Sequence, residues 1–265
     1  MCGVVGVWRF DGRPVDPASA RDMRDALTHR GPDDAGLWVE GPVALGHRRL
    51  SIIDLSEAGR MPMASPDGSV RAVFNGEVYN FRELRAELRA KGHPFHSETD
   101  SEVVLRAYEQ WGADCFDRFN GMFALAIWDA RERRMILARD AAGQKPLYYA
   151  YRPGKWLLLA STLAPLLRYA GSELDVDAEV VKDYVRFGFP PDTRAMLKDV
   201  YTVAPGTFTI VEQDSGPRSH PYFDLAAYAE QAPTRHGDER AVLEEFRGAM
   251  REAVRARLVA DVPLG

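Results

Sequence analysis

A cysteine stands directly after the initiator methionine, in the stretch MCGVVGVW. We expect removal of Met1, which leaves Cys2 with a thiol and a free α-amino group on one residue. A thiol with a pKa of about 8.5 is little ionised at neutral pH, whereas an α-amino group with a pKa of about 7.7–8.0 is an effective base there. Cys2 is therefore a candidate nucleophile that needs no separate histidine. Taken alone, the position also fits an ordinary residue of a first strand.

The elements that would position Cys2 are short strands and a few helices. Asp16 before Pro17 predicts a helix start, with Gly31 after its end. Asn80 is expected to cap a second helix that stops at Gly92. Further helices are predicted over 101–112 and 177–187, and strands over 2–10, 48–54, 70–76, 122–129, 134–140, 146–152, 156–161, 205–211 and 219–225. This order predicts an α+β fold with helices on one side of antiparallel strands.

Composition narrows the class of protein. The 34 basic and 39 acidic residues give a net charge of −5, which argues against general attraction to nucleic acid or an anionic membrane. No apolar run approaches the roughly 20 residues of a membrane helix. The only cysteines, Cys2 and Cys115, fit a reducing cytoplasm rather than a disulfide framework. The six histidines have no metal-ligand spacing, so we predict no metal site.

The last forty residues have a different character. Residues 225–240 have the composition of a linker, and residues 241–265 begin with a helical pattern. Its apolar positions are Val242, Phe246, Met250, Val254 and Leu258. Such a face needs a partner, so this segment is either the start of a further domain or a docking helix for a separate protein.

Several motifs occur in a fixed order. The chain resembles the class II, N-terminal nucleophile, glutamine amidotransferase domain of glutamine-hydrolysing asparagine synthetases. The resemblance covers nearly the whole chain and implies a four-layer αββα sandwich with two stacked antiparallel sheets over residues 1–224. It rests on CGVVGVW, LTHRGPDDAG, LGHRRLSIIDL, FNGEVYNFREL and TDSEV, followed by GMFALAIWD, ARDAAGQKPLYYA, FGFPPDTRAMLKDVYTVAPGT and RLVADVPLG.

The resemblance also implies a role for each site residue. Cys2 would attack the side-chain amide of glutamine, and Asn75 with the Gly76 N–H would stabilise the oxyanion. Arg49 would bind the α-carboxylate. The α-ammonium would be bound by the carboxylates of Asp100 and Glu77, with backbone carbonyls near Ile52 and Ile53.

Each of these residues also has a simpler interpretation. Arg49 or its neighbour Arg48 would ordinarily be a surface arginine, although the spacing to LSIID favours Arg49 as the ligand. Asn75 with Gly76 is typical of a hairpin turn, and Glu77 of a solvated carboxylate. Asp100 is expected to cap the helix that begins at Ser101 and can serve in both roles. For His29 and His47 we expect structural hydrogen bonds rather than proton transfer.

The sequence departs from the family pattern at three positions and at its end. Thr162 stands where glutamate is common, and Ala142 and Gln144 replace an aromatic and an aliphatic residue. These segments lie toward the partner domain in the family, so communication between domains is expected to differ. The SGGxDS loop that follows DVPxG in the family, and holds ATP there, does not occur in these 265 residues.

The expected function is therefore the glutaminase half of an asparagine synthetase in the cytoplasm. Glutamine is the substrate, no cofactor is needed in this portion, and Mg-ATP is expected for the synthetase domain that would receive the ammonia. Two alternatives stay open: the same glutaminase serving a different amide acceptor, such as a peptide or cell-surface sugar acid, or a silent glutamine-binding module. A homodimer is possible.

Overall fold

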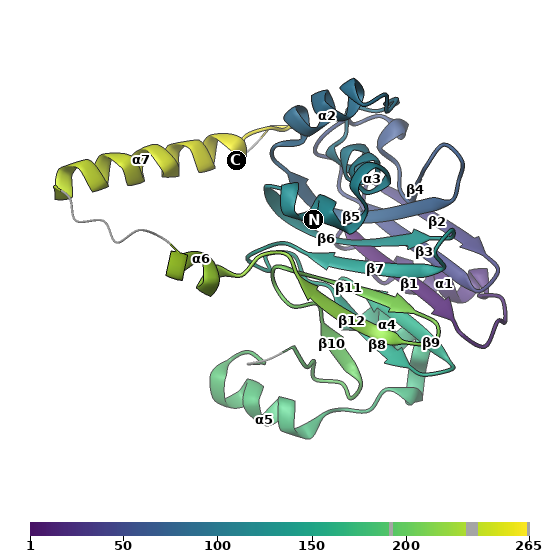
Figure 1. The fold of residues 1–265 in the computed structure, drawn as a ribbon. Coiled ribbons are helices and arrows are strands. Elements are labelled where there is room, and N and C mark those ends of the chain that lie inside the picture. Colours follow the sequence, from purple (N-terminus) through teal and green to yellow (C-terminus); the bar gives the residue numbers. More distant parts are fainter. Residues whose placement is uncertain (191–192, 232–237, 264–265) are drawn as a thin grey trace.

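Two six-stranded antiparallel sheets are stacked face to face in the computed structural model, which describes residues 1–190, 193–231 and 238–263 (Figure 1). Sheet A contains, in spatial order, β10 (Val200–Thr202), β8 (Tyr148–Arg152), β9 (Trp156–Ala160), β1 (Gly3–Arg9), β3 (Val43–Arg49) and β2 (Asp34–Glu40). Sheet B contains β12 (Gly216–Pro221), β11 (Thr207–Glu212), β7 (Arg134–Arg139), β6 (Gly121–Asp129), β5 (Val70–Val78) and β4 (Met63–Ala64).

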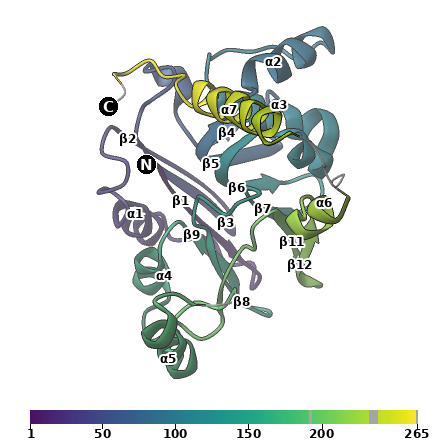
Figure 2. The ribbon, with the colours of Figure 1, turned by 90° about the vertical axis from the view of Figure 1, so that its left-hand side faces the viewer.

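Helices cover the outer faces of both sheets, which confirms the four-layer αββα sandwich (Figure 2). The α1 (Pro17–Asp25) and α4 (Leu163–Ala170) helices pack on sheet A, and α2 (Phe81–Ala90) and α3 (Asp100–Trp111) pack on sheet B. The expectation from element order alone, helices on one side only, is wrong. The remaining helices are α5 (Ala178–Phe187), α6 (Leu225–Gln231), α7 (Glu239–Ala256) and the short turns η1 (Glu57–Gly59), η2 (Gly112–Arg118) and η3 (Gly171–Glu173).

Side chains of β1 alternate between two hydrophobic cores, one on each face of sheet A. In β1, Val5 and Val7 belong to the core beneath α1 and α4, whereas Val4 and Trp8 belong to the core between the sheets. Successive side chains of a strand point to opposite faces, so a strand buried on both sides is apolar throughout. Trp8 meets Trp128 of the other sheet edge to face, with ring centroids 4.9 Å apart. The strand that follows Cys2 is therefore fixed from both faces.

Helix starts agree with the sequence only in part. Asp16 caps α1 as predicted, because its carboxylate accepts the N–H groups of Ala18 and Ser19. The cap of α3 is Thr99, whose hydroxyl accepts the Glu102 N–H, so the assignment of that cap to Asp100 is wrong. Asn80 precedes α2, but among the described residues its side chain makes no capping hydrogen bond.

The strand predictions also need correction. The 48–54 stretch is not a strand, because β3 ends at Arg49 and a loop follows. The last strand, β12, lies at Gly216–Pro221 rather than 219–225. The edge strands β2, β4 and β10 and the α4 helix had no counterpart among the predicted elements.

The two C-terminal helices, α6 and α7, lie apart from the layers (Figure 1). The range 225–240, predicted to be a linker, contains α6, and its residues 232–237 lie outside the described part of the chain. The predicted helix of residues 241–265 begins at Glu239, and residues 264–265 are likewise outside that part. Its apolar residues Val242, Phe246, Met250, Val254 and Leu258 are exposed. Within the described residues, no helix combines the length and apolar character needed to cross a membrane.

Candidate active site

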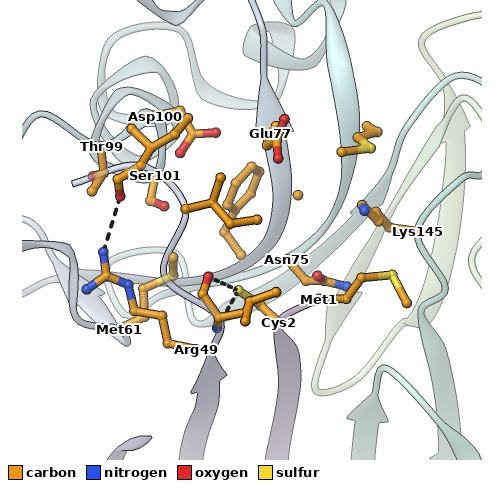
Figure 3. A pocket seen from close by; sticks show the side chains of 16 residues that line it. Met1, Cys2, Arg49, Met61, Asn75, Glu77, Thr99, Asp100, Ser101 and Lys145 are labelled. Carbon is orange, nitrogen blue, oxygen red and sulfur yellow. Dashed lines mark hydrogen bonds between the residues drawn. The ribbon is translucent and has the colours of Figure 1, made fainter. Parts of the chain in front are cut away.

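All eight predicted site residues line one cavity of about 250 Å³ (Figure 3). Cys2 lies just before β1, Arg49 ends β3, and Asp100 begins α3. The other predicted residues are Ile52 and Ile53 of the loop after β3 and Asn75, Gly76 and Glu77 of β5. The cavity is therefore built from both sheets and one helix, and it forms only where the two sheets are stacked.

Cys2 is held at the centre of the cavity by the backbone of Leu50. The Leu50 N–H donates to Cys2 Sγ at 3.4 Å, and the thiol lies 3.6 Å from the Leu50 carbonyl oxygen. Burial raises the pKa of the Cys2 thiol, and burial also lowers the pKa of the Met1 amino group. With Met1 present the terminal amine belongs to Met1 and the Cys2 nitrogen is an amide, so the base predicted for this thiol forms only when Met1 is removed.

Two residues without an assigned catalytic role hold the parts of the cavity together. The Arg30 guanidinium donates from Nε to the Cys2 carbonyl oxygen at 3.1 Å, which fixes the residue that carries the nucleophile. His47 Nε2 lies 3.0 Å from the Phe74 carbonyl oxygen and connects sheet A to the strand of Asn75. Burial lowers the pKa of His47 to about 4, so the ring is neutral and donates to this carbonyl. The structural role expected for His47 is confirmed.

Asn75 and Gly76 present the donors expected for an oxyanion. Asn75 is 1% exposed, and its side-chain Nδ2 has no hydrogen-bond partner among the described residues. A buried amide without a partner costs free energy, and a negatively charged oxygen in the cavity would satisfy it. Gly76 has a separate requirement, since a Cβ there would lie 2.2 Å from the Met122 carbonyl oxygen of β6. The hairpin-turn interpretation is wrong, because both residues lie inside β5.

Arg49 is fixed by the loop that follows it. Its Nη1 donates to the Ser56 carbonyl oxygen at 2.8 Å, and its Nη2 donates to the carbonyl oxygens of Ile53 and Asp54. Three of its five N–H donors are thus used for positioning, which leaves two for a ligand. A Cβ at Gly59 would lie 2.1 Å from Nη2, so Gly59 is needed for this arrangement. No sequence motif had indicated a role for Gly59.

Glu77 and Asp100 form the acidic end of the cavity. Asp100 is 5% exposed, and burial raises the pKa of its carboxyl to about 7, with further upward contribution from the nearby Glu77. Its carboxylate accepts the Val78 N–H at 2.9 Å. Burial also raises the pKa of Glu77. Two partly desolvated carboxylates side by side are stabilised by a cation, so this end suits an ammonium group.

The backbone carbonyl oxygens of Ile52 and Ile53 each already accept one hydrogen bond. The Ile52 oxygen accepts the Asp261 N–H at 2.8 Å, and the Ile53 oxygen accepts Arg49 Nη2 at 3.3 Å. A carbonyl oxygen has two lone pairs, so each can accept one further donor.

Lys145 also lines the cavity and was not predicted. It is 9% exposed, and burial lowers the pKa of its ammonium group, while Glu77 and Cys2 act in the opposite direction. The Asp140 carboxylate accepts the backbone N–H of Lys145 at 3.0 Å and so fixes the turn that carries Lys145. Figure 3 places the Lys145 side chain near Met1 and Asn75. Lys145 lies within the motif ARDAAGQKPLYYA, which is the sequence signal that points to it.

The three departures from the family pattern lie outside the cavity lining. Ala142 and Gln144 are exposed in the Asp140 turn, and their N–H groups donate to the Asp140 carboxylate. Thr162 precedes α4, and its buried hydroxyl has no partner among the described residues. No group of three or more His, Cys, Asp or Glu residues in the described ranges could hold a metal ion.

Comparisons with known proteins agree with this geometry. Asparagine synthetase [glutamine-hydrolyzing] 3 of Bacillus subtilis is 33% identical over 271 residues, covering 100% of this chain and 42% of the relative. Amidase chry2 of Gibberella zeae is 33% identical over 276 residues, covering 100% of this chain and 40% of the relative. The chain thus spans about two fifths of the length of these relatives.

Solved structures share the fold. The glutamine phosphoribosylpyrophosphate amidotransferase of Bacillus subtilis superimposes with a TM-score of 0.61 at 21% identity, covering 84% of this chain and 49% of that one. The model of the glutamine amidotransferase domain matches residues 1–223. The matched range contains both sheets and all eight predicted cavity residues. The chain therefore belongs to the glutamine amidotransferase domain family.

Proposed function

We propose that this chain is the glutaminase part of an asparagine synthetase. The observation that carries the proposal is the convergence on one cavity of a thiol, a buried amide donor with no partner in the described part of the chain, an arginine and two carboxylates. Glutamine has the matching groups: a side-chain amide, an α-carboxylate and an α-ammonium.

In the proposed reaction, Cys2 Sγ attacks the amide carbon of glutamine while its proton passes to the α-amino group. The carbonyl electrons move to the oxygen, which the Asn75 side chain and the Gly76 N–H stabilise, an interaction worth about 100–1000-fold in rate. The tetrahedral intermediate collapses to a thioester, and the nitrogen leaves as ammonia after receiving that proton. Water then attacks the thioester and releases glutamate. Arg49 holds the α-carboxylate, and Asp100 with Glu77 holds the α-ammonium.

The domain assignment is part of this proposal. Residues 1–224 form the amidotransferase domain, 225–240 the linker, and 241–265 the first helix of an ATP-dependent synthetase domain. The exposed apolar side chains of α7 and the greater length of the relatives support this. Mg-ATP would bind to that synthetase domain, where it would activate aspartate for amidation. No cofactor is proposed for the glutaminase step, and a cytoplasmic location is proposed from the two free cysteines.

The test is the release of glutamate and ammonia from glutamine by the purified chain without an N-terminal tag. We expect hydrolysis that is lost in Cys2→Ala. Hydrolysis at a comparable rate by Cys2→Ala would refute the assignment of the nucleophile. Glutamine binding without hydrolysis, with Met1 shown to be absent by intact mass, would favour the silent glutamine-binding module.

A second candidate keeps the glutaminase and changes the acceptor. Relatives named amidase chry2 and amidase chyE, at 33% and 35% identity, support this alternative. The acceptor can be identified by supplying the full-length protein with labelled glutamine, Mg-ATP and either aspartate or other carboxylic acids. A possible homodimer is tested by light scattering.

A further inference from the structure

The loop of residues 50–56 determines where Arg49 lies. Three of its carbonyl oxygens, those of Ile53, Asp54 and Ser56, accept hydrogen bonds from the two terminal nitrogens of the Arg49 guanidinium. A change in the path of this loop therefore moves the group proposed to bind the α-carboxylate of glutamine.

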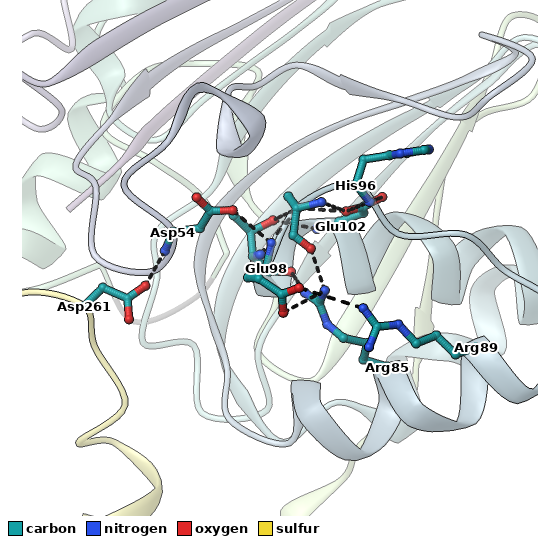
Figure 4. A network of polar contacts seen from close by, with 9 residues as sticks. Asp54, Arg85, Arg89, His96, Glu98, Glu102 and Asp261 are labelled. Atoms are coloured by element: carbon teal, nitrogen blue, oxygen red, sulfur yellow. Dashed lines mark hydrogen bonds and ion pairs between the residues drawn. The ribbon is translucent and has the colours of Figure 1, made fainter.

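This loop has a conformation that needs support from outside. Asp54 has a φ of 54°, in the left-handed region, which a non-glycine residue adopts only where hydrogen bonds hold it there. The Asp54 carboxylate accepts the Ser56 N–H at 3.0 Å within the loop and the Glu98 N–H at 2.9 Å from the turn before α3 (Figure 4). Local bonds thus fix the Asp54 side chain, while its backbone N–H is free to bind a distant partner.

That partner is Asp261, 207 residues further along the chain. The Asp54 N–H donates to Asp261 Oδ2 at 2.7 Å (Figure 4). The Asp261 N–H donates to the Ile52 carbonyl oxygen at 2.8 Å. One residue thus binds the loop on both sides of Ile53, through its side chain and its backbone.

Neighbouring residues bring the same segment to this place. Val259 packs against the core beneath sheet B, in which Ile53 also takes part. The Arg257 guanidinium lies 4.6 Å from the centre of the Tyr79 ring, next to the end of β5. The segment after α7 therefore lies against the wall of the cavity on the side of Arg49.

We propose that Asp261 is a positioning residue for glutamine binding, which holds the 50–56 loop in the conformation that presents Arg49 to the substrate. The inference rests on the proposed glutaminase function. It implies that glutamine affinity depends on where the segment after α7 is placed, because a displacement of Asp261 removes two hydrogen bonds from the loop.

The test compares Asp261→Ala, Asp261→Asn and the control Glu252→Ala in the 265-residue chain. Glu252 is an exposed carboxylate of α7 and does not line the cavity. We expect Asp261→Ala to raise KM for glutamine about tenfold with kcat within about twofold, since a hydrogen bond to a charged group contributes a factor of this order. Asp261→Asn keeps an acceptor oxygen and is expected to restore a KM near the wild-type value, and Glu252→Ala to change neither constant.

Alkylation of Cys2 by iodoacetamide separates positioning from a general loss of structure. This reagent does not need Arg49, and the buried Cys115 is protected from it. We expect Asp261→Ala to react at the wild-type rate. The inference is overturned if the wild type hydrolyses glutamine and Asp261→Ala has the same KM. It is also overturned if Asp261→Ala shows a lower kcat and slower alkylation of Cys2 along with weaker glutamine binding, because that result indicates a general loss of structure. If the wild type neither hydrolyses nor binds glutamine, the proposed function itself fails, and this inference fails with it.

Discussion

Asp100→Asn is expected to make the fold more stable at pH 8 and glutamine binding weaker. Burial raises the pKa of the Asp100 carboxyl from 3.8 to about 7. At pH 8 the charged carboxylate therefore destabilises the folded state by about 4 kcal/mol, because each pKa unit corresponds to about 1.4 kcal/mol. The unpaired N–H donors of a buried amide cost about 1–3 kcal/mol. The net gain is then about 2 kcal/mol, or about 4–8 °C in Tm.

The pH dependence has a defined sign. Because the pKa of Asp100 is higher in the folded protein than in the unfolded chain, the folded state binds this proton more tightly. The free energy of unfolding of the wild type therefore rises as pH falls from about 7 toward 3.8. The variant has no carboxyl at this position, so its free energy of unfolding gains nothing from this protonation. Thermal unfolding followed by circular dichroism from pH 8 to pH 5 should show the Tm advantage of the variant shrinking. Asp114→Asn, at an exposed position outside the cavity, is the matched control and should show no trend.

Glutamine kinetics test the same residue independently. Loss of a charge-assisted hydrogen bond to the α-ammonium lowers kcat/KM about 10- to 100-fold. In the wild type, kcat/KM should fall as pH drops below about 7 and Asp100 gains its proton, and the variant should lack this part of the profile. A variant that is destabilised equally at pH 8 and pH 5, and that retains the wild-type pH profile, would refute the reasoning.

Three further substitutions probe the cavity. Gly76→Ala places a methyl group 2.2 Å from the Met122 carbonyl oxygen, and kcat should fall about 100-fold or more as the oxyanion donor is displaced, measured by glutamate release. Arg49→Lys removes the planar fork, and KM for glutamine should rise about 10- to 100-fold with a smaller change in kcat. Lys145→Met removes a buried cation near Cys2, and iodoacetamide alkylation of Cys2 at pH 7 should slow about three- to tenfold; an unchanged rate would exclude electrostatic help from Lys145.

The cavity residues could be predicted because they occur in motifs whose spacing is local. Cys2, Arg49, Asn75 and Asp100 each sit in a short stretch of recognisable sequence. The residues that hold them could not be predicted in the same way. Arg30 and Asp261 bind backbone groups of residues distant in sequence, and Gly59 leaves space for the Arg49 guanidinium. No pattern of residue types marks a contact with a backbone group or a space left for a side chain.

The elements that were predicted wrongly from the sequence also have physical explanations. The 48–54 stretch is apolar and β-branched like a strand, but Ile53 packs on the core while its carbonyl binds Arg49, which a sheet would prevent. The β2 strand was missed because it lies at the sheet edge, where its residues are half-exposed and show no alternation. In α4, Pro165 resembles a break, yet it lies in the first turn, where no N–H is needed.

The position of β1 has a consequence for the order of events during synthesis. The residues of β1 leave the ribosome before those of β3 and β9, between which β1 lies, and Val5 pairs with Ala160. At about 5–20 residues per second, β9 is made roughly 10–30 s after β1. During that interval Met1 is accessible to an aminopeptidase, and Met1 is still 56% exposed once the sheet has formed. Removal of Met1 is therefore not restricted to the time before β1 is paired, and the speed of translation does not limit the maturation of the nucleophile.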